Sequence, residues 1–293
     1  MIAILRVLCP VDLSAASGEA LRYAAELASV MHAELTVLHV DATLASGRDD
    51  EGAAALVAFI ADALGTTAAP HALHRRGQPT EEILRSSGAI GADLIVMGSH
   101  GRTGLSRLLL GSVSEAVARR SPTPVLVVPA TGTGQPRAVT PDPVLCAVDF
   151  SASSPRAIAY AASLAAAAGA GLLLAHVLEW SEEHDTVPSA DGGRFPTSED
   201  DAIARLNVSV TDDMRSRCRL ELAVGYGEPG DELLRLVQEH DVAIVVLGVS
   251  GRNPLDLTVF GSTARRVIRE AGRPVLTVGA SVQPSRSTQL SSA

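Results

Sequence analysis

Glycines and a serine recur with one spacing in two parts of this chain, and their types suit the binding of an anion. The first set comprises Gly98, Gly101, Gly111 and Ser112, in the stretch GSHGRTGLSRLLLGS. The second set comprises Gly248, Gly251, Gly261 and Ser262, in the stretch GVSGRNPLDLTVFGS. Glycine lets backbone N–H groups approach a ligand closely, and the helix expected after each loop presents a partial positive charge at its N-terminus. The shared pattern G-x2-G-x9-G-S therefore predicts a phosphate-binding loop in each part.

A purely structural explanation of the same residues is that Gly98 ends a strand and Ser112 caps a helix. In the second stretch, however, the spacing is kept while the residues between the glycines have changed. This favours phosphate binding, because a loop that only had to turn the chain needs far fewer residues.

An aspartate ends the first expected strand of each part, Asp12 in VDLS and Asp149 in VDFS. A carboxylate beside a phosphate loop repels a bare anion, but it can accept a hydrogen bond from a ribose hydroxyl or help to hold a divalent metal. The alternative is an Asx turn that starts a helix, in which Asp12 precedes Ser14 and Asp149 precedes Ser151.

The second expected strands end in His39-Val40 and His176-Val177. The backbone edge at Val40 and at Val177 is suited to read an adenine, whereas we interpret the two histidines as structural. Aromatic residues make up only 3% of the chain, so a bound base would lie between aliphatic side chains.

The composition excludes several classes of chemistry. Lysine is absent, and all 24 basic residues are arginine. This excludes a Walker-type phosphate loop, which needs Gly-Lys-Ser or Gly-Lys-Thr, and it excludes a lysine Schiff base. A net charge of −9 argues against general binding of nucleic acid. The cysteines form no C-x-x-C pair, and Cys9 and Cys146 lie in apolar runs that predict buried residues without a metal or redox role.

The two parts are copies of one another. The stretch Leu8 to Val40 aligns without a gap with Leu145 to Val177, and about half of the positions are identical. The turn Gly77-Gln78-Pro79 recurs as Gly227-Glu228-Pro229. The second copy has 13 more residues between these blocks, and we assign them to the polar stretch from Glu179 to Asp201.

Strands and helices are expected to alternate within each copy. In the first copy the expected strands are Ile4–Pro10, Glu34–Val40, His71–Arg75, Asp93–Met97 and Pro124–Pro129. The expected helices are Ser17–Met31, Glu51–Leu64, Thr80–Ala89 and Ser112–Arg120. The second copy is expected to follow the same plan. Such alternation predicts a doubly wound α/β domain, in which a parallel sheet is covered by helices on both faces.

We therefore expect two domains, residues 1–130 and 143–280, joined by a linker at 131–142 and followed by a disordered tail at 281–293. The uncharged run from Tyr160 to Leu178 approaches the length of a membrane span, but its pattern predicts a helix followed by a strand. No signal peptide precedes the first strand, and the protein is expected to be cytoplasmic.

Each copy resembles a domain of the universal stress protein family. The resemblance rests on the VDLS and VDFS motifs, the two G-x-P turns and GSHGRTGLSRLLLGSVSE. It implies an adenine nucleotide alpha hydrolase-like fold with a five-stranded parallel sheet in the order 3-2-1-4-5. It also implies ATP, together with Mg²⁺, as the ligand. The last strands, PVLVV and PVLTV, would join the copies in an intramolecular pseudo-dimer, with room for a further homodimer and with neither nucleic acid nor membrane as a partner.

The same resemblance implies which residues bind the nucleotide. In the first copy, the carboxylate would lie on the ribose or metal side, the strand-end backbone at the adenine and the glycine loop at the phosphates. These residues are Asp12, Val40, Gly98, Gly101, Arg102, Gly111, Ser112 and Val113. Their counterparts in the second copy are Asp149, Val177, Gly248, Gly251, Arg252, Gly261 and Ser262.

The second copy departs from the first where charge matters. Asp256 and Leu257 stand where the first copy has Ser106 and Arg107. An extra carboxylate and a lost arginine weaken the binding of a triphosphate through Coulomb repulsion. We therefore expect the first copy to bind ATP more tightly than the second.

The favoured function is an ATP-binding regulatory protein of the stress response, not an enzyme. The chain has neither the H-x-G-H pair of an adenylyl-transfer enzyme nor the SGGxDS loop of an ATP pyrophosphatase. Near the phosphates, His100 and Arg102 are the only candidate catalytic helpers. Two alternatives stay open, namely a weak ATPase or nucleotidyl-transfer enzyme, and a tandem scaffold that binds no nucleotide.

Overall fold

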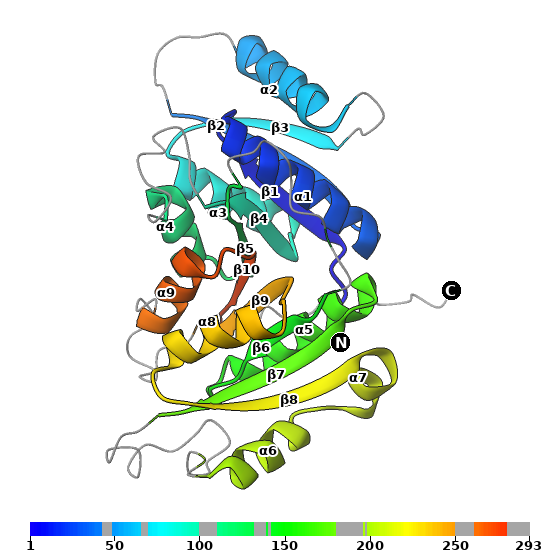
Figure 1. The fold of residues 1–293 in the computed structure, drawn as a ribbon. Helices are drawn as coiled ribbons and strands as arrows, with labels where there is room; N and C mark the ends of the chain where they lie inside the picture. Colours follow the sequence, from blue (N-terminus) through cyan, green and yellow to red (C-terminus); the bar gives the residue numbers. More distant parts are fainter. Residues whose placement is uncertain are drawn as a thin grey trace.

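The structure is a computed structural model, shown in Figure 1. It describes residues 1–42, 49–65, 70–99, 110–131, 139, 142–179, 196, 198–249 and 261–279. We refer to residues 1–130 as the first copy and to residues 143–280 as the second copy.

The described residues of both copies build one ten-stranded sheet. The first copy supplies β1 (Arg6–Val11), β2 (Glu34–Asp41), β3 (His71–Arg76), β4 (Leu94–Gly98) and β5 (Val125–Val128). The second supplies β6 (Val144–Ala147), β7 (Gly171–Leu178), β8 (Arg219–Tyr226), β9 (Ile244–Gly248) and β10 (Val275–Val278). The strand order is β3-β2-β1-β4-β5-β10-β9-β6-β7-β8. The expected order 3-2-1-4-5 is therefore confirmed in each copy, and neighbouring strands within a copy are parallel.

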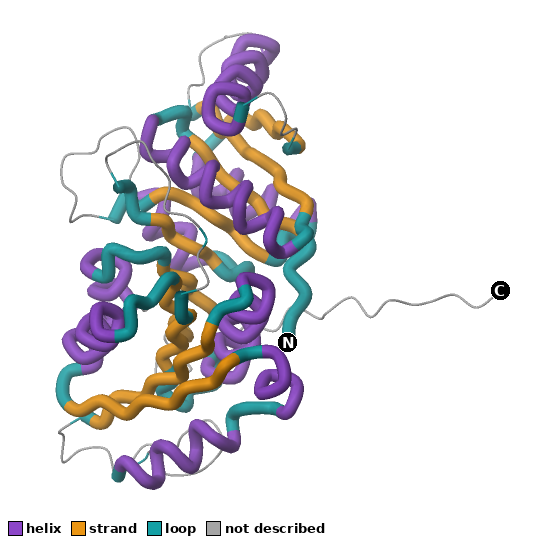
Figure 2. Tube along the Cα trace, turned by 45° about the vertical axis from the view of Figure 1, so that its right-hand side comes forward, coloured by secondary structure: helices purple, strands orange, loops and turns teal. Residues whose placement is uncertain are grey.

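Helices cover both faces of the sheet, as a doubly wound fold requires (Figures 1 and 2). One face carries α1 (Ala15–Met31), α2 (Asp49–Leu64), α5 (Ser154–Ala168), α6 (Glu199–Val208) and α7 (Asp212–Arg217). The other face carries α3 (Pro79–Ile90), α4 (Ser112–Arg120), α8 (Pro229–Glu239) and α9 (Ser262–Glu270).

The strand β4 shows why the sheet is buried on both faces. Its side chains alternate between the two hydrophobic clusters, with Leu94 and Val96 on the α1 face and Ile95 and Met97 on the α4 face. All four are at most 5% exposed. An uninterrupted apolar run is what a parallel strand covered on both sides requires.

The run from Tyr160 to Leu178 forms the end of α5 followed by β7, as expected. None of the helices in the part of the chain that the structure describes is both long and apolar enough to cross a membrane. Cys9 and Cys146 are free and buried in the sheet, which confirms the prediction that they are buried. Burial raises the pKa of the Cys9 thiol to about 12, so it stays protonated and unreactive at neutral pH.

The second copy does not repeat the plan of the first copy everywhere. Where the first copy has the single helix α2, the second has two shorter helices, α6 and α7. The break has a local cause, because the hydroxyl of Thr211 accepts a hydrogen bond from the N–H of Met214 at 3.3 Å and so starts a new helix. The expectation of identical elements in both copies is therefore wrong at this point.

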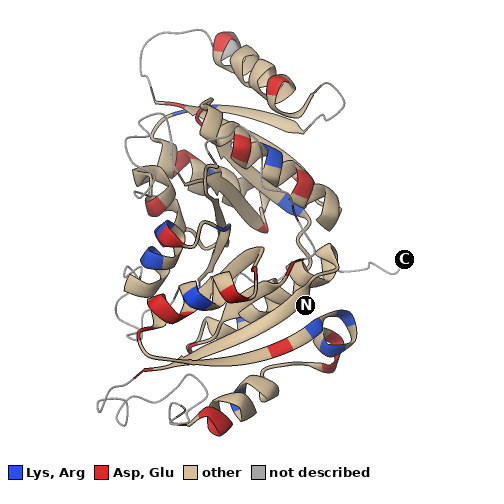
Figure 3. Cartoon of the chain, viewed as in Figure 1, with Lys and Arg blue, Asp and Glu red and all other residues tan. Residues whose placement is uncertain are grey.

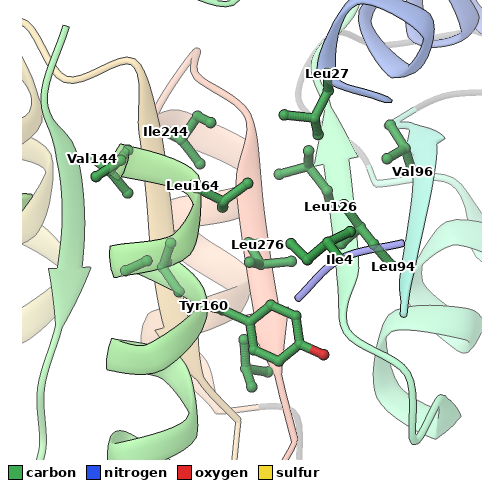
Figure 4. Packing of buried hydrophobic residues seen from close by; sticks show 14 of the residues in the cluster. Ile4, Leu27, Leu94, Val96, Leu126, Val144, Tyr160, Leu164, Ile244 and Leu276 are labelled. Atoms are coloured by element: carbon green, nitrogen blue, oxygen red, sulfur yellow. The ribbon is translucent and has the colours of Figure 1, made fainter. Parts of the chain in front are cut away.

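The copies join through their last strands, which pair antiparallel. Leu126 of β5 lies opposite Leu276 of β10. Both leucines are fully buried, and each hydrophobic cluster contains residues of both copies (Figure 4). The two cores are thus continuous across this joint.

Polar contacts beside α5 reinforce the joint. The hydroxyl of Tyr160 donates to the carbonyl oxygen of Asp93 in the first copy at 3.2 Å. The N–H of Ile2 donates to the hydroxyl of Ser163 at 2.8 Å. Since these groups are otherwise shielded from water, each contact satisfies a polar atom that the joint removes from solvent.

We expect Leu126→Ala and Leu276→Ala each to lower the free energy of unfolding by about 2–5 kcal/mol, because each leaves a cavity in a fully buried joint. Urea denaturation measures the change. Leu5→Ala is the matched control, since Leu5 is 59% exposed and its loss should change stability by less than about 0.5 kcal/mol. Stability unchanged in both core variants would contradict the joint as described.

Candidate functional site

A cavity of about 230 Å³ opens at the carboxyl ends of β1, β2 and β4 in the first copy. Its described lining consists of Pro10, Val11, Asp12, Ser17, Leu38, Val40, Pro79, Ile83, Met97, Gly98, Gly111, Ser112, Val113 and Ser114. Six residues that the sequence had indicated meet in this one space, namely Asp12, Val40, Gly98, Gly111, Ser112 and Val113. They meet because parallel strands end at the same edge of the sheet, where doubly wound folds bind their ligands.

Asp12 shapes the turn that leads from β1 into α1. Its Oδ1 accepts hydrogen bonds from the N–H of Ser14 at 3.1 Å and from the hydroxyl of Ser14 at 2.6 Å. The hydroxyl of Ser14 in turn accepts from the N–H of Ser17 and caps α1. The Asx-turn interpretation is therefore correct, and the same carboxylate also faces the cavity.

The corresponding turn of the second copy also has its aspartate as the acceptor, although a different serine supplies the hydroxyl. Oδ1 of Asp149 accepts from the N–H of Ser151 at 2.9 Å and from the hydroxyl of Ser154 at 2.7 Å. Leu13 and Phe150, which follow the two aspartates, have φ angles of 63° and 56°. Bulky residues rarely adopt this left-handed conformation, so both copies hold a strained backbone at the same place.

The helix α4 begins beside the cavity without a capping side chain. Gly111 is the N-cap, and its carbonyl oxygen accepts the first helical hydrogen bond, from the N–H of Glu115. Ser112 is the first helical residue and makes no capping bond, so the structural explanation of Ser112 as the N-cap is wrong. Ser114 turns inward instead, and its hydroxyl donates to the carbonyl oxygen of Gly98 at 2.8 Å. No side chain among the described residues therefore caps the first N–H groups of α4.

The helix α9 of the second copy starts in the same way, with Gly261 as an N-cap that makes no side-chain bond. Every other helix whose N-cap is described differs. Side chains cap α1, α6, α7 and α8, whereas α3 and α5 have a proline in the first turn, which removes a donor. Among the described N-caps, α3 and α5 also lack a capping side-chain bond, but the N-cap is a glycine in the two helices that follow the glycine loops.

The backbone at these N-caps does not require glycine. The φ and ψ angles are −60° and 142° at Gly111 and −53° and 149° at Gly261, which any residue adopts. A Cβ built on Gly261 would meet no described atom within 4 Å. Nothing among the described residues therefore fills the space that a side chain at position 261 would take.

Gly248 has a different explanation. A Cβ at this position would overlap the hydroxyl of Ser153, which is fully buried against it. The first copy has Ala16 in the place of Ser153. Close packing is thus one reason for glycine at position 248, and its place in the second nucleotide site stays a prediction.

The two strand-end histidines hold the backbone next to the aspartates. Nδ1 of His39 donates to the carbonyl oxygen of Val11 at 2.9 Å, and Nδ1 of His176 donates to that of Val148 at 2.7 Å. The ring of His176 also lies against Phe150, with 4.7 Å between the ring centres. The interpretation of both histidines as structural is confirmed. Their hydrogen bonds hold the strand ends that lead into the turns at Asp12 and Asp149.

Arginine–carboxylate pairs tie together the helices that flank the strand ends, where residues of both signs mix (Figure 3). In the first copy Arg120 at the end of α4 binds Glu81 at the start of α3 at 2.6 Å, and this bond lowers the pKa of Glu81. In the second copy Arg266 at the start of α9 binds Asp231 and Glu228 at the start of α8. Different residues thus make the same link between the helices.

Some expected site residues lie outside the described residues. These are Gly101, Arg102, Gly251 and Arg252, together with His100, Ser106, Arg107, Asp256 and Leu257. Val177 lies near the end of β7 opposite Gly225 of β8, as the expectation of a strand-end position requires. In the described ranges, no group of three or more His, Cys, Asp or Glu side chains is placed to hold a metal ion.

The sequence reasoning missed Pro79 and Ile83, which line the cavity from α3. The signal was present in the repeated G-x-P turn. Gly77 has a φ of 141°, and its N–H donates to the carbonyl oxygen of Asp41 at 3.0 Å, so the turn fastens the start of α3 to the end of β2. The repeated G-x-P turn therefore places α3 against the site.

The pH dependence of stability tests the role of His176. Burial lowers the pKa of His176, so its folded form prefers the neutral ring while the unfolded chain binds a proton near pH 6.5. Its contribution is therefore present above pH 6.5 and is lost as the pH falls below it. We expect the unfolding free energy of the wild type to drop more steeply between pH 7.5 and 5.5 than that of His176→Asn, which keeps a donor at the position of Nδ1 but does not titrate. Parallel pH profiles would contradict this role.

The comparisons with known proteins agree with the fold. The model of the universal stress protein family matches residues 4–129 and again 141–279. A universal stress protein of Mycolicibacterium smegmatis is 27% identical over 291 residues, which cover 93% of this chain and 96% of that protein. A universal stress protein of Methanocaldococcus jannaschii is 34% identical over 137 residues, or 42% of this chain and 81% of that protein. The crystal structure of a universal stress protein from Archaeoglobus fulgidus has a TM-score of 0.67 at 26% identity and covers 94% of this chain and 96% of its own.

Proposed function

The chain belongs to the universal stress protein family, and from that premise we propose that it is a regulatory protein that binds ATP at the carboxyl end of the sheet in each copy. We also propose residues 1–130 and 143–280 as its two nucleotide-binding domains.

The observation that carries the proposal is the pair of uncapped helix N-termini at Gly111 and Gly261. A serine or aspartate at an N-cap would stabilise the helix better than glycine does. In both copies no side chain among the described residues caps the helix, a Cβ on Gly261 would meet no described atom within 4 Å, and in the first copy the start of α4 lines the cavity. Phosphate oxygens satisfy such N–H groups and are attracted by the helix dipole.

The rest of the cavity suits the remainder of a nucleotide. Its walls include the aliphatic residues Leu38, Val40, Ile83 and Val113, between which a base can lie without aromatic stacking. Asp12 supplies a carboxylate in the cavity wall for a ribose hydroxyl or for Mg²⁺. Mg²⁺ commonly takes one or two carboxylates and completes its coordination with phosphates and water, so it needs no preformed cluster of ligands.

The described lining favours binding over catalysis. Asp12 is the only ionisable residue among the described residues of the cavity wall, and its Oδ1 is already engaged in the Asx turn. General acid–base chemistry on a phosphate needs a positioned proton donor or acceptor. We therefore propose that nucleotide occupancy, and not turnover, is the regulatory signal.

The first experiment is to denature freshly purified protein, identify any released nucleotide and titrate MgATP into the emptied protein by calorimetry. Gly111→Val and Gly261→Val should each abolish binding in their own copy and leave the other site intact, because a branched side chain then fills the space before the helix. Gly88→Val is the matched control, since Gly88 is exposed in α3 with no atom near its missing Cβ.

Three outcomes would redirect the proposal. Undiminished binding in the Gly111→Val/Gly261→Val double variant would place the nucleotide elsewhere. A wild type that neither carries nor binds ATP would favour the tandem scaffold. Steady hydrolysis that His100→Ala or Arg102→Ala removes without loss of binding would favour the weak ATPase.

We expect the first copy to bind ATP more tightly than the second, because Asp256 and Leu257 replace Ser106 and Arg107 in the loop. The two glycine variants allow the comparison, since Gly261→Val reports the first site and Gly111→Val the second. Asp256→Ser in the Gly111→Val background should strengthen the remaining site. Tighter binding at the second site would show that these loop charges do not set the order.

A further inference from the structure

Glu115 and Arg265 occupy equivalent positions in the two copies and carry opposite charges. They are 150 residues apart, as are Gly111 and Gly261, so each lies in the first turn of its helix behind the glycine N-cap. In the folded chain they contact each other, with 3.4 Å between Nη2 of Arg265 and Oε1 of Glu115. A residue of one copy thus meets its own counterpart in the other copy.

The pairing of the last strands explains this meeting. Leu126 and Leu276 are also equivalent residues 150 apart, and they lie opposite each other in the antiparallel pair β5–β10. A local twofold axis therefore passes between these leucines. Side chains close to such an axis meet their equivalents, which places α4 beside α9 (Figure 1).

The charge of Arg265 is unfavourable within its own helix. A cation in the first turn opposes the helix dipole, whereas Glu115 in the same place in α4 is favourable. The side chain of Arg265 is also 49% exposed, so packing does not require it. The partner that accounts for an arginine at this position is Glu115 of the other copy.

We propose that Glu115 and Arg265 make the copy interface, formed by β5, β10, α4 and α9, selective for unlike copies. Two first copies joined through the same edge would bring Glu115 against Glu115, and two second copies would bring Arg265 against Arg265. The edge of the first copy therefore pairs favourably with the edge of a second copy, in the same chain or in another. Pairing between two first copies is disfavoured by charge repulsion.

The linker favours pairing within one chain. The N–H and the hydroxyl of Thr131 donate to the carboxylate of Glu19, at 2.6 and 3.0 Å. The N–H of Val139 donates to Glu26 at 3.1 Å. Both glutamates belong to α1, so Thr131 and Val139 of the connection between the copies are held along the first copy.

Charge reversal in the full-length protein tests the selectivity. Glu115→Arg and Arg265→Glu place like charges across the axis, and each should lower the Tm by about 2 °C. The double variant Glu115→Arg/Arg265→Glu restores an attractive pair and should return to near the wild-type Tm. Arg269→Glu, an exposed reversal one turn further along α9, is the control, and its effect should simply add to that of Glu115→Arg.

The helix dipole alone predicts different results. It would make Arg265→Glu stabilising and the effects of the two reversals additive. Either result would overturn the proposal, as would a double variant less stable than both single variants.

Partner choice is then measured by refolding the two single variants together and counting mixed chain pairs by native mass spectrometry. Exchange of copies between a Glu115→Arg chain and an Arg265→Glu chain forms two attractive pairs, whereas each chain alone contains a repulsive one. Mixed pairs should therefore exceed the like pairs of either variant several-fold. Mixed pairs only twice as abundant as the like pairs of either variant, the ratio that random pairing gives, would show that the interface does not select.

Discussion

The antiparallel pairing of β5 with β10 is the contact on which the rest of the molecule depends. Each copy alone would expose the edge of a short apolar strand, a form that invites uncontrolled association. By covering each other, the two edges extend the sheet across both copies and make each hydrophobic cluster continuous. The same pairing sets the local twofold axis and hence brings the first turns of α4 and α9 together.

Function and stability oppose each other at the strand ends. The N-cap glycines provide no capping side chain for their helices, and the residues after Asp12 and Asp149 adopt a left-handed backbone that L-residues avoid. The surrounding structure offsets these costs through the serine bonds to both aspartates and through the histidines that hold the strand ends. Such local compromise is typical of a site that must present backbone groups to a ligand.

The two copies keep the same geometry with different residues. The link between the helices beside the strand ends runs from the end of α4 in one copy and from the start of α9 in the other. The second copy also divides one helix into two and packs Ser153 against Gly248. The fold constrains which helices must be tied together, but it does not constrain which side chains tie them, and the copies were free to diverge in charge.

The sequence by itself determined the repeat, the alternation of strands and helices, the strand order through family resemblance, and six of the residues that line the cavity. These features can be predicted because hydrophobic periodicity and glycine spacing are recognisable within short stretches of the sequence. Only the tertiary structure decided that Gly111 and not Ser112 is the N-cap of α4, that Ser153 packs against Gly248, and that Glu115 meets Arg265. Each of these depends on the path of the backbone or on contacts between distant segments. Such contacts produce no periodic pattern in the sequence from which they could be predicted.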